Sequence, residues 1–163
     1  MPEGDVFLKL EGIIARLSEE YSSPLFPPHV TLVGQVKGPV HKVLSDTKEL
    51  AFLMAPYEIV LADVDFLDSY FKSLFVRCRE TEEVMAANSL AREIFGRKDD
   101  PPYMPHLSLA YGDFSVDEKK RMITKTGGSF NMKFTADALH LYSTEGAPHQ
   151  WKMVESFSLG AKI

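Results

Sequence analysis

Apolar side chains in the N-terminal stretch recur every three or four positions, the spacing of one face of an α-helix. The positions on this face are Phe7, Leu10, Ile14, Leu17 and Tyr21. The pattern predicts an amphipathic helix over residues 5–22, which the following Ser23 and Pro24 end. Gly12 within it costs about 1 kcal/mol relative to alanine, so the apolar face must compensate.

Three further helices are expected from periodicity and from residues that start or stop helices. Gly38 and Pro39 open the second, whose inward positions are Val40, Val43, Leu44, Leu50 and Ala51. Thr81 caps the third, and Gly96 stops it. The fourth begins with the capping box of residues 115–118 and ends at residues 127–128, both glycine.

Strands are expected between these helices. Residues 57–66 and 70–79 form two strands around Asp68 and Ser69, and residues 130–142 and 151–159 form two closing strands. Two shorter extended segments, at 28–32 and 105–109, each begin with a proline, which also favours extended chain just before it.

The order of these elements repeats. Each half of the chain reads helix, short strand, helix, two strands, and no linker or low-complexity tract divides residues 1–163. We therefore expect one α+β domain made of two pseudo-symmetric lobes, each an antiparallel sheet flanked by helices, with a central cleft.

The two short extended segments carry nearly the same five residues. Residues 28–32 read PHVTL and residues 105–109 read PHLSL, and their histidines lie 77 positions apart. In a strand, residues two apart share a face, so His29 would lie beside Thr31 and His106 beside Ser108. Two such strands side by side would present two imidazoles and two hydroxyls, a set suited to proton transfer at a phosphate.

Two other interpretations of the histidines are open on this pattern. They could be edge-strand histidines with satisfied hydrogen bonds. They could also be zinc ligands, although neither an HExxH run nor a cysteine pair accompanies them, so we expect no metal.

Composition narrows the class of protein. The chain is 45% hydrophobic and 25% charged, as in soluble globular proteins, and it has no apolar run long enough for a membrane span. Its net charge of −5 argues against a broad surface for long nucleic acid. The single cysteine, Cys78, rules out an internal disulfide and sits in an apolar run. We expect a buried thiol in a cytoplasmic monomer.

The paired His-x-Thr/Ser-Leu motifs resemble those of the 2H phosphoesterase (LigT-like) superfamily. The stretch PYMPHLSLAY at residues 102–111, the acid-rich helix after it, residues 26–32 and the first helix are similar to plant and fungal cyclic phosphodiesterases. The resemblance covers most of the chain. Family members have a further strand before the first helix, where this sequence already begins its helix, so we expect an exposed sheet edge.

The resemblance implies hydrolysis of ADP-ribose 1″,2″-cyclic phosphate and nucleoside 2′,3′-cyclic phosphates without metal or cofactor, linked to tRNA splicing. His106 would activate water, and His29 would protonate the leaving oxygen. Thr31 and Ser108 would donate hydrogen bonds to the phosphate, and Tyr111 matches a family tyrosine that could bind it.

Three aromatic residues, Tyr70, Phe71 and Tyr103, are candidates for stacking on a base. His41, His140 and His149 lie outside the motifs and are interpreted as surface or packing residues. Three alternatives remain open: a 2H enzyme that processes RNA ends, a nucleotide-binding module without turnover, and a purely structural partner domain that binds no nucleotide.

Overall fold

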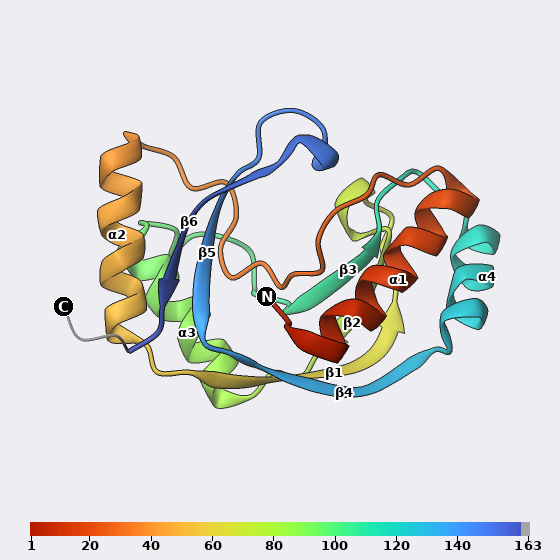
Figure 1. Cartoon of the computed structure of the whole chain (residues 1–163), viewed down its shortest axis with the longest axis horizontal. Coiled ribbons are helices and arrows are strands. Elements are labelled where there is room, and N and C mark those ends of the chain that lie inside the picture. Colours follow the sequence, from red (N-terminus) through yellow and green to blue (C-terminus); the bar gives the residue numbers. More distant parts are fainter. Residues whose placement is uncertain (161–163) are drawn as a thin grey trace.

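A computed structural model describes residues 1–160 of the chain, which contain four helices and six strands (Figure 1). The helices are α1 (Gly4–Tyr21), α2 (Val40–Leu53), α3 (Glu82–Ile94) and α4 (Val116–Thr126). The strands are β1 (Tyr57–Asp65), β2 (Leu74–Cys78), β3 (His106–Ala110), β4 (Ser129–Ala136), β5 (Ala138–Ser143) and β6 (Lys152–Ser158). Two 3₁₀ turns, η1 (Tyr70–Lys72) and η2 (Pro148–Gln150), complete the elements.

The strands form two antiparallel sheets. One has four strands in the order β3-β2-β1-β4, and the other has the two strands β5 and β6. The expectation of an α+β fold with antiparallel sheets is therefore confirmed. The strand counts of the two sheets differ, so the described sheets do not themselves display the predicted pseudo-symmetry.

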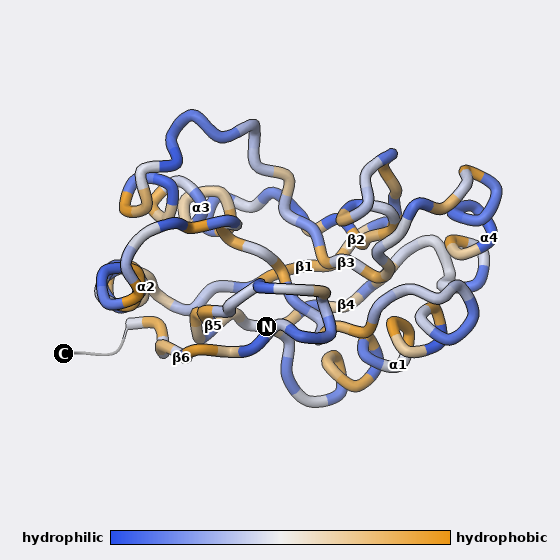
Figure 2. The backbone as a smooth tube through the Cα atoms, turned by 90° about the horizontal axis from the view of Figure 1, so that it is seen from above, coloured by the Kyte–Doolittle hydropathy of each residue, from blue (hydrophilic) through white to orange (hydrophobic). Residues whose placement is uncertain are grey.

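Each sheet has its own helices. The apolar face of α1 packs against β3 and β4, with Leu10, Ile13, Ile14 and Leu17 buried. On the other side of the molecule, α2 covers β5 and β6 and also contacts α3, which reaches β1 (Figure 1). The tube of α1 alternates between hydrophobic and hydrophilic stretches, as an amphipathic helix should (Figure 2).

The helix boundaries follow the capping residues. The Thr81 side chain accepts a hydrogen bond from the amide of Val84 at the start of α3. At the start of α4, Ser115 and Glu118 form the predicted capping box. Gly127 ends α4 in the left-handed region, at φ +98°. Gly12 stands on an exposed part of α1, where no atom crowds it.

One structural expectation is wrong for the first motif. Residues 28–32 do not form a regular strand, and only an isolated bridge between Val30 and Leu107 joins them to β3. Proline has no amide hydrogen, so Pro27 and Pro28 cannot donate to a ladder. The carbonyls that follow the motif histidine are instead bound by side chains from α3 and the loop after it.

Two other strand boundaries need correction. The expected strand over 70–79 begins as η1, where the amide of Lys72 bonds to the carbonyl of Ser69, and β2 starts only at Leu74. The expected single strand over 130–142 is two strands in different sheets, β4 and β5, separated at Asp137. The carbonyl of Asp137 accepts a hydrogen bond from the amide of Leu159, which ties this break to the end of β6.

Candidate active site

The second motif lies on β3, at the edge of the four-stranded sheet. Leu107 and Leu109 are fully buried in the core beneath it. Because strand side chains alternate, His106 and Ser108 share the opposite face. The predicted pairing of an imidazole and a hydroxyl on one face of a strand is therefore present at this motif.

The bridge to β3 places the first motif beside the second. Val30 pairs with Leu107, which places its neighbour His29 beside β3. Charge on His29 lowers the pKa of His106, which fits this placement. The structure thus brings both histidines, which are far apart in sequence, together at β3.

The two imidazoles are held in the same way. Nδ1 of His29 donates to the carbonyl of Pro27 over 2.7 Å, and Nδ1 of His106 donates to the carbonyl of Met104 over 2.8 Å. A carbonyl oxygen can only accept, so Nδ1 carries the hydrogen in both rings. In the neutral rings Nε2 is then the basic nitrogen, available for proton transfer.

Both histidines have a pKa below the ordinary value. Burial is the main cause at His29, opposed by its hydrogen bond to Pro27. Burial is also the main cause at His106, where the charges of Lys72, His29 and Arg77 lower the pKa further. Both rings are therefore mainly neutral near pH 7 in the absence of an anion.

Side chains from α3 and the loop after it hold the first motif. The Tyr103 hydroxyl donates to the carbonyl of Thr31 over 3.0 Å, and the Asn88 amide donates to the carbonyl of Leu32 over 2.7 Å. Arg97 donates to the carbonyls of Gly34 and Gln35. These contacts replace the ladder that an edge strand would have had.

Ser108 and Tyr111 belong to one buried group. The Ser108 hydroxyl donates to the carbonyl of Phe71 over 3.3 Å, and the Tyr111 ring stacks on Phe26 with centroids 4.0 Å apart. Burial raises the pKa of Tyr111 to about 12, and a hydrogen bond with Ser108 partly offsets this. Tyr111 is only 4% exposed, so its hydroxyl could contact a ligand only from the buried position beside Phe26.

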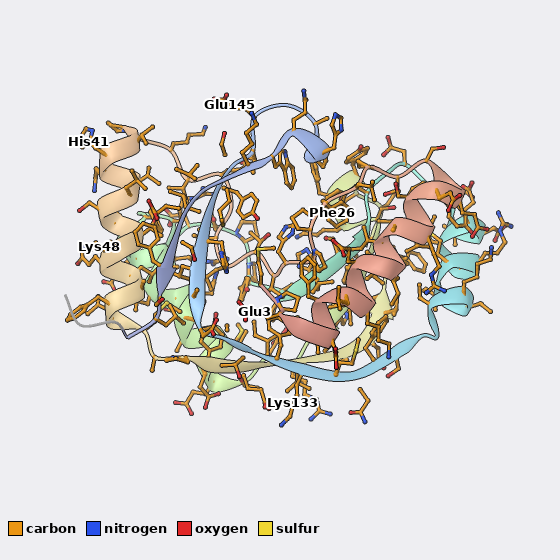
Figure 3. The ribbon with its side chains drawn as sticks, viewed as in Figure 1. Glu3, Phe26, His41, Lys48, Lys133 and Glu145 are labelled. Carbon is orange, nitrogen blue, oxygen red and sulfur yellow. The ribbon has the colours of Figure 1, made fainter. Side chains whose placement is uncertain are left out.

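The aromatic candidates differ in accessibility. Phe71 is 52% exposed and Tyr70 39%, and their rings meet edge to face at 5.0 Å. Tyr103 is more enclosed, and burial raises the pKa of its hydroxyl. Phe26 lies in the central region of the molecule, whereas His41 lies on the outer side of α2 (Figure 3).

A protein-family model described as "Cyclic phosphodiesterase-like protein" matches residues 1–159. The chain belongs to the cyclic phosphodiesterase-like family. This confirms the resemblance to cyclic phosphodiesterases of the 2H, or LigT-like, superfamily.

Two curated relatives of this family member carry matching names. The present chain is 26% identical over 120 residues to the "Cyclic phosphodiesterase" of Arabidopsis thaliana, and the match covers 74% of this chain and 66% of the plant protein. It is 25% identical over 175 residues to a "2′,3′-cyclic-nucleotide 3′-phosphodiesterase" of Phaeosphaeria nodorum, covering 90% of each.

Solved structures show the same fold. A protein of Thermus thermophilus superimposes with a TM-score of 0.67 at 20% identity, covering 98% of this chain and 94% of that one. LigT of E. coli, crystallised with NADP+, superimposes with a TM-score of 0.63 at 13% identity, covering 94% of this chain and 92% of that one. The family fold is thus shared at low sequence identity.

Trp151 of this cyclic phosphodiesterase-like chain was not singled out from sequence. Its ring centroid lies 6.5 Å from that of His29 and 6.2 Å from that of Phe71, and its indole nitrogen is buried without a partner among residues 1–160. It is the one tryptophan of the chain and directly precedes β6, which was the available signal.

No three histidine, cysteine or carboxylate side chains come together as a metal site within residues 1–160. In the same range, no helix has the length and apolar character to span a membrane. Cys78 is buried, and burial raises its pKa to about 12, so its thiol is not a nucleophile at neutral pH.

Two surface hollows of about 530 and 510 Å³ contain no motif residue; one lies between α1 and β4 and the other at the β5–β6 turn. The chemical groups gathered beside β3 therefore remain the candidate active site.

Proposed function

We propose that this protein hydrolyses cyclic phosphodiesters to phosphomonoesters by paired-histidine acid and base catalysis, without a metal. The substrates are nucleoside 2′,3′-cyclic phosphates and ADP-ribose 1″,2″-cyclic phosphate, which would link the enzyme to products of tRNA splicing. The main support for this proposal is the pair of motif imidazoles. Backbone carbonyls accept from Nδ1 of both rings, which leaves both Nε2 atoms available for proton transfer.

In the proposed reaction, His106 Nε2 takes a proton from water as the water oxygen bonds to phosphorus. The bond from phosphorus to one ribose oxygen breaks on the opposite side. Protonated His29 gives its Nε2 proton to that leaving oxygen. The depressed pKa of His106 favours the neutral form that a base needs, and an anionic phosphate beside His29 would favour its protonated form.

Thr31 and Ser108 would donate hydrogen bonds to the non-bridging phosphate oxygens as charge builds there. Ser108 would exchange its bond to the Phe71 carbonyl for one to phosphate. Tyr111 would support the phosphate through its hydroxyl, and Tyr70, Phe71 and Tyr103 are the proposed base-stacking residues. We infer a monomer in the cytoplasm whose two lobes face one another across this site.

The test measures hydrolysis of 2′,3′-cyclic AMP and ADP-ribose 1″,2″-cyclic phosphate in EDTA, with a phosphatase releasing phosphate only from the opened ring. His29→Ala and His106→Ala should each lower kcat by about 10²- to 10⁴-fold, as expected for loss of an acid or base. His41→Ala is the matched control, because His41 is exposed on the outer side of α2 and should leave activity unchanged.

The outcomes separate the alternatives. Turnover in EDTA that collapses in both motif variants supports the mechanism, and the ratio of rates on the two substrates defines the preferred one. A folded wild type that binds 2′,3′-cyclic AMP without opening it would instead be a nucleotide-binding module. Turnover that disappears in EDTA and returns with added zinc would contradict the metal-free mechanism.

A further inference from the structure

Arg77 lies directly opposite the candidate base on the neighbouring strand. In the register of β2 against β3, Arg77 pairs with His106 and Phe75 pairs with Ser108. Residues directly opposite in an antiparallel pair point to the same face, with Cβ atoms about 4.5–5.5 Å apart. Arg77 therefore projects from the same face of the sheet as His106.

The Arg77 guanidinium has a fixed orientation. Asp65 on β1 accepts a hydrogen bond from its Nε over 2.7 Å, and the same carboxylate oxygen forms an ion pair with its Nη2 at 2.5 Å. The other oxygen of Asp65 accepts from the amide of Phe66 over 2.8 Å, which holds the carboxylate itself. The edge of the guanidinium that carries Nη1 is not the edge on Asp65, and 43% of the Arg77 side chain is exposed.

The side chains whose charge acts on His106 are all basic, although the whole chain carries −5. Lys72 and Arg77 both act on His106, and the Asp65 carboxylate is partner to only one of them. A local cationic surface in an acidic protein favours an anionic ligand at that place.

We propose that Arg77 binds a second phosphate of the substrate, separate from the cyclic phosphate that is opened. This proposal rests on the proposed function and narrows its substrate class to cyclic phosphodiesters that carry a further phosphate across the ribose. A planar guanidinium matches phosphate oxygens in a two-point arrangement, and Asp65 holds it ready for that contact. The pyrophosphate of ADP-ribose 1″,2″-cyclic phosphate and a 5′-phosphate on a 2′,3′-cyclic nucleotide share this chemistry.

The kinetic test compares three substrates: adenosine 2′,3′-cyclic phosphate, its 5′-phosphorylated form, and ADP-ribose 1″,2″-cyclic phosphate. Arg77→Gln should raise KM about tenfold for the two substrates with a further phosphate, the effect of one lost charged hydrogen bond, and leave KM for the first nearly unchanged. Arg77→Lys should restore part of the loss. A selective effect on only one of the two phosphorylated substrates identifies which source the site accepts.

The matched control is Lys133→Gln. Lys133 belongs to the same sheet and forms an ion pair with Glu58 over 2.8 Å, but it lies on the outer side of β4, away from Phe26 (Figure 3). It should change KM for none of the three substrates. Rates are compared at the pH optimum of each variant, so that a shifted pKa of His106 does not imitate a binding effect.

A binding arm keeps this inference separate from the proposed function. Calorimetry measures the affinity of adenosine 3′-monophosphate and of adenosine 3′,5′-bisphosphate, which differ by one phosphate. Tighter binding of the bisphosphate in the wild type that Arg77→Gln abolishes supports the inference even if no ring is opened. An Arg77→Gln variant that keeps the preference, or that weakens both ligands equally, overturns it.

Discussion

Removing one hydroxyl at Tyr103 should reduce activity far more than it reduces stability. That hydroxyl donates to the carbonyl of Thr31, so Tyr103→Phe removes the bond and keeps the ring. A neutral hydrogen bond contributes about 0.5–1.5 kcal/mol, and the loss should fall in the lower half of this range because Thr31 is exposed and water can bind its carbonyl. For a chain of this size the melting temperature should drop by roughly 1–4 °C.

The activity change is larger because the first motif has no ladder of its own. Besides the Val30 bridge, side-chain bonds to the carbonyls of residues 31, 32, 34 and 35 fix its position, and Tyr103 supplies the one at Thr31. A displacement of about 1 Å in a catalytic group can cost around 100-fold in rate. We therefore expect kcat to fall about tenfold or more, with KM changed by less than about threefold.

The assay is the coupled hydrolysis of 2′,3′-cyclic AMP, with melting curves for each variant. Tyr57→Phe serves as the control, because it removes a hydroxyl from another enclosed tyrosine. Tyr57 is half-buried on β1, and burial raises its pKa to about 12. Tyr103→Leu tests the stacking hypothesis, since it removes the ring as well. Unchanged kcat in Tyr103→Phe, or an equal fall in Tyr57→Phe, would refute the positioning role. A rise in KM only in Tyr103→Leu would favour stacking.

The remaining predictions concern protonation and a buried lysine. The pH profile of kcat/KM should be bell-shaped, because one motif histidine must be neutral and the other protonated. Its maximum should lie below about pH 6.5, because both histidines have a lowered pKa. A maximum above pH 8 would contradict this prediction. Denaturant titrations at several pH values should show that the free energy of unfolding falls as pH drops below about 6.5 and levels off below the folded pKa values of His29 and His106. The reason is that both histidines have a lowered pKa in the folded state, so the unfolded state binds more protons in this range. A variant without both histidines should show a smaller loss of stability. Lys119→Met should cost about 1–3 kcal/mol of unfolding free energy, since the buried ammonium donates to the Leu67 carbonyl and approaches Asp68 at 3.7 Å, whereas Lys120→Met, at an exposed position of the same helix, should cost little.

The helices and the second motif could be predicted because their signals are local. Thr81 and the Ser115 capping box mark helix starts by bonds within three residues, and alternation along residues 106–110 gives the two faces of β3. The break at Asp137 was not predicted, because apolar residues continue on both sides of it and the change of sheet depends on hydrogen-bond partners far away in the sequence.

The site beyond the motifs depends on pairing between distant residues. Asn88 and Tyr103 bind carbonyls 56 and 72 positions earlier in the chain. Arg77 has the sequence pattern of any strand cation, and only the register of β2 against β3 places it opposite His106. Sequence periodicity describes which way a side chain points within its own strand, but it does not give the register between strands.

The unequal support of the two motifs has a consequence for the proposed chemistry. His106 is fixed by the ladder between β2 and β3, whereas the residues after His29 are held by Asn88, Arg97 and Tyr103. All three lie on the segment from residue 88 to residue 106, which ends in His106 itself. One continuous segment therefore carries the second histidine and also holds the first in place. A displacement of this segment would therefore be expected to change the position of both imidazoles.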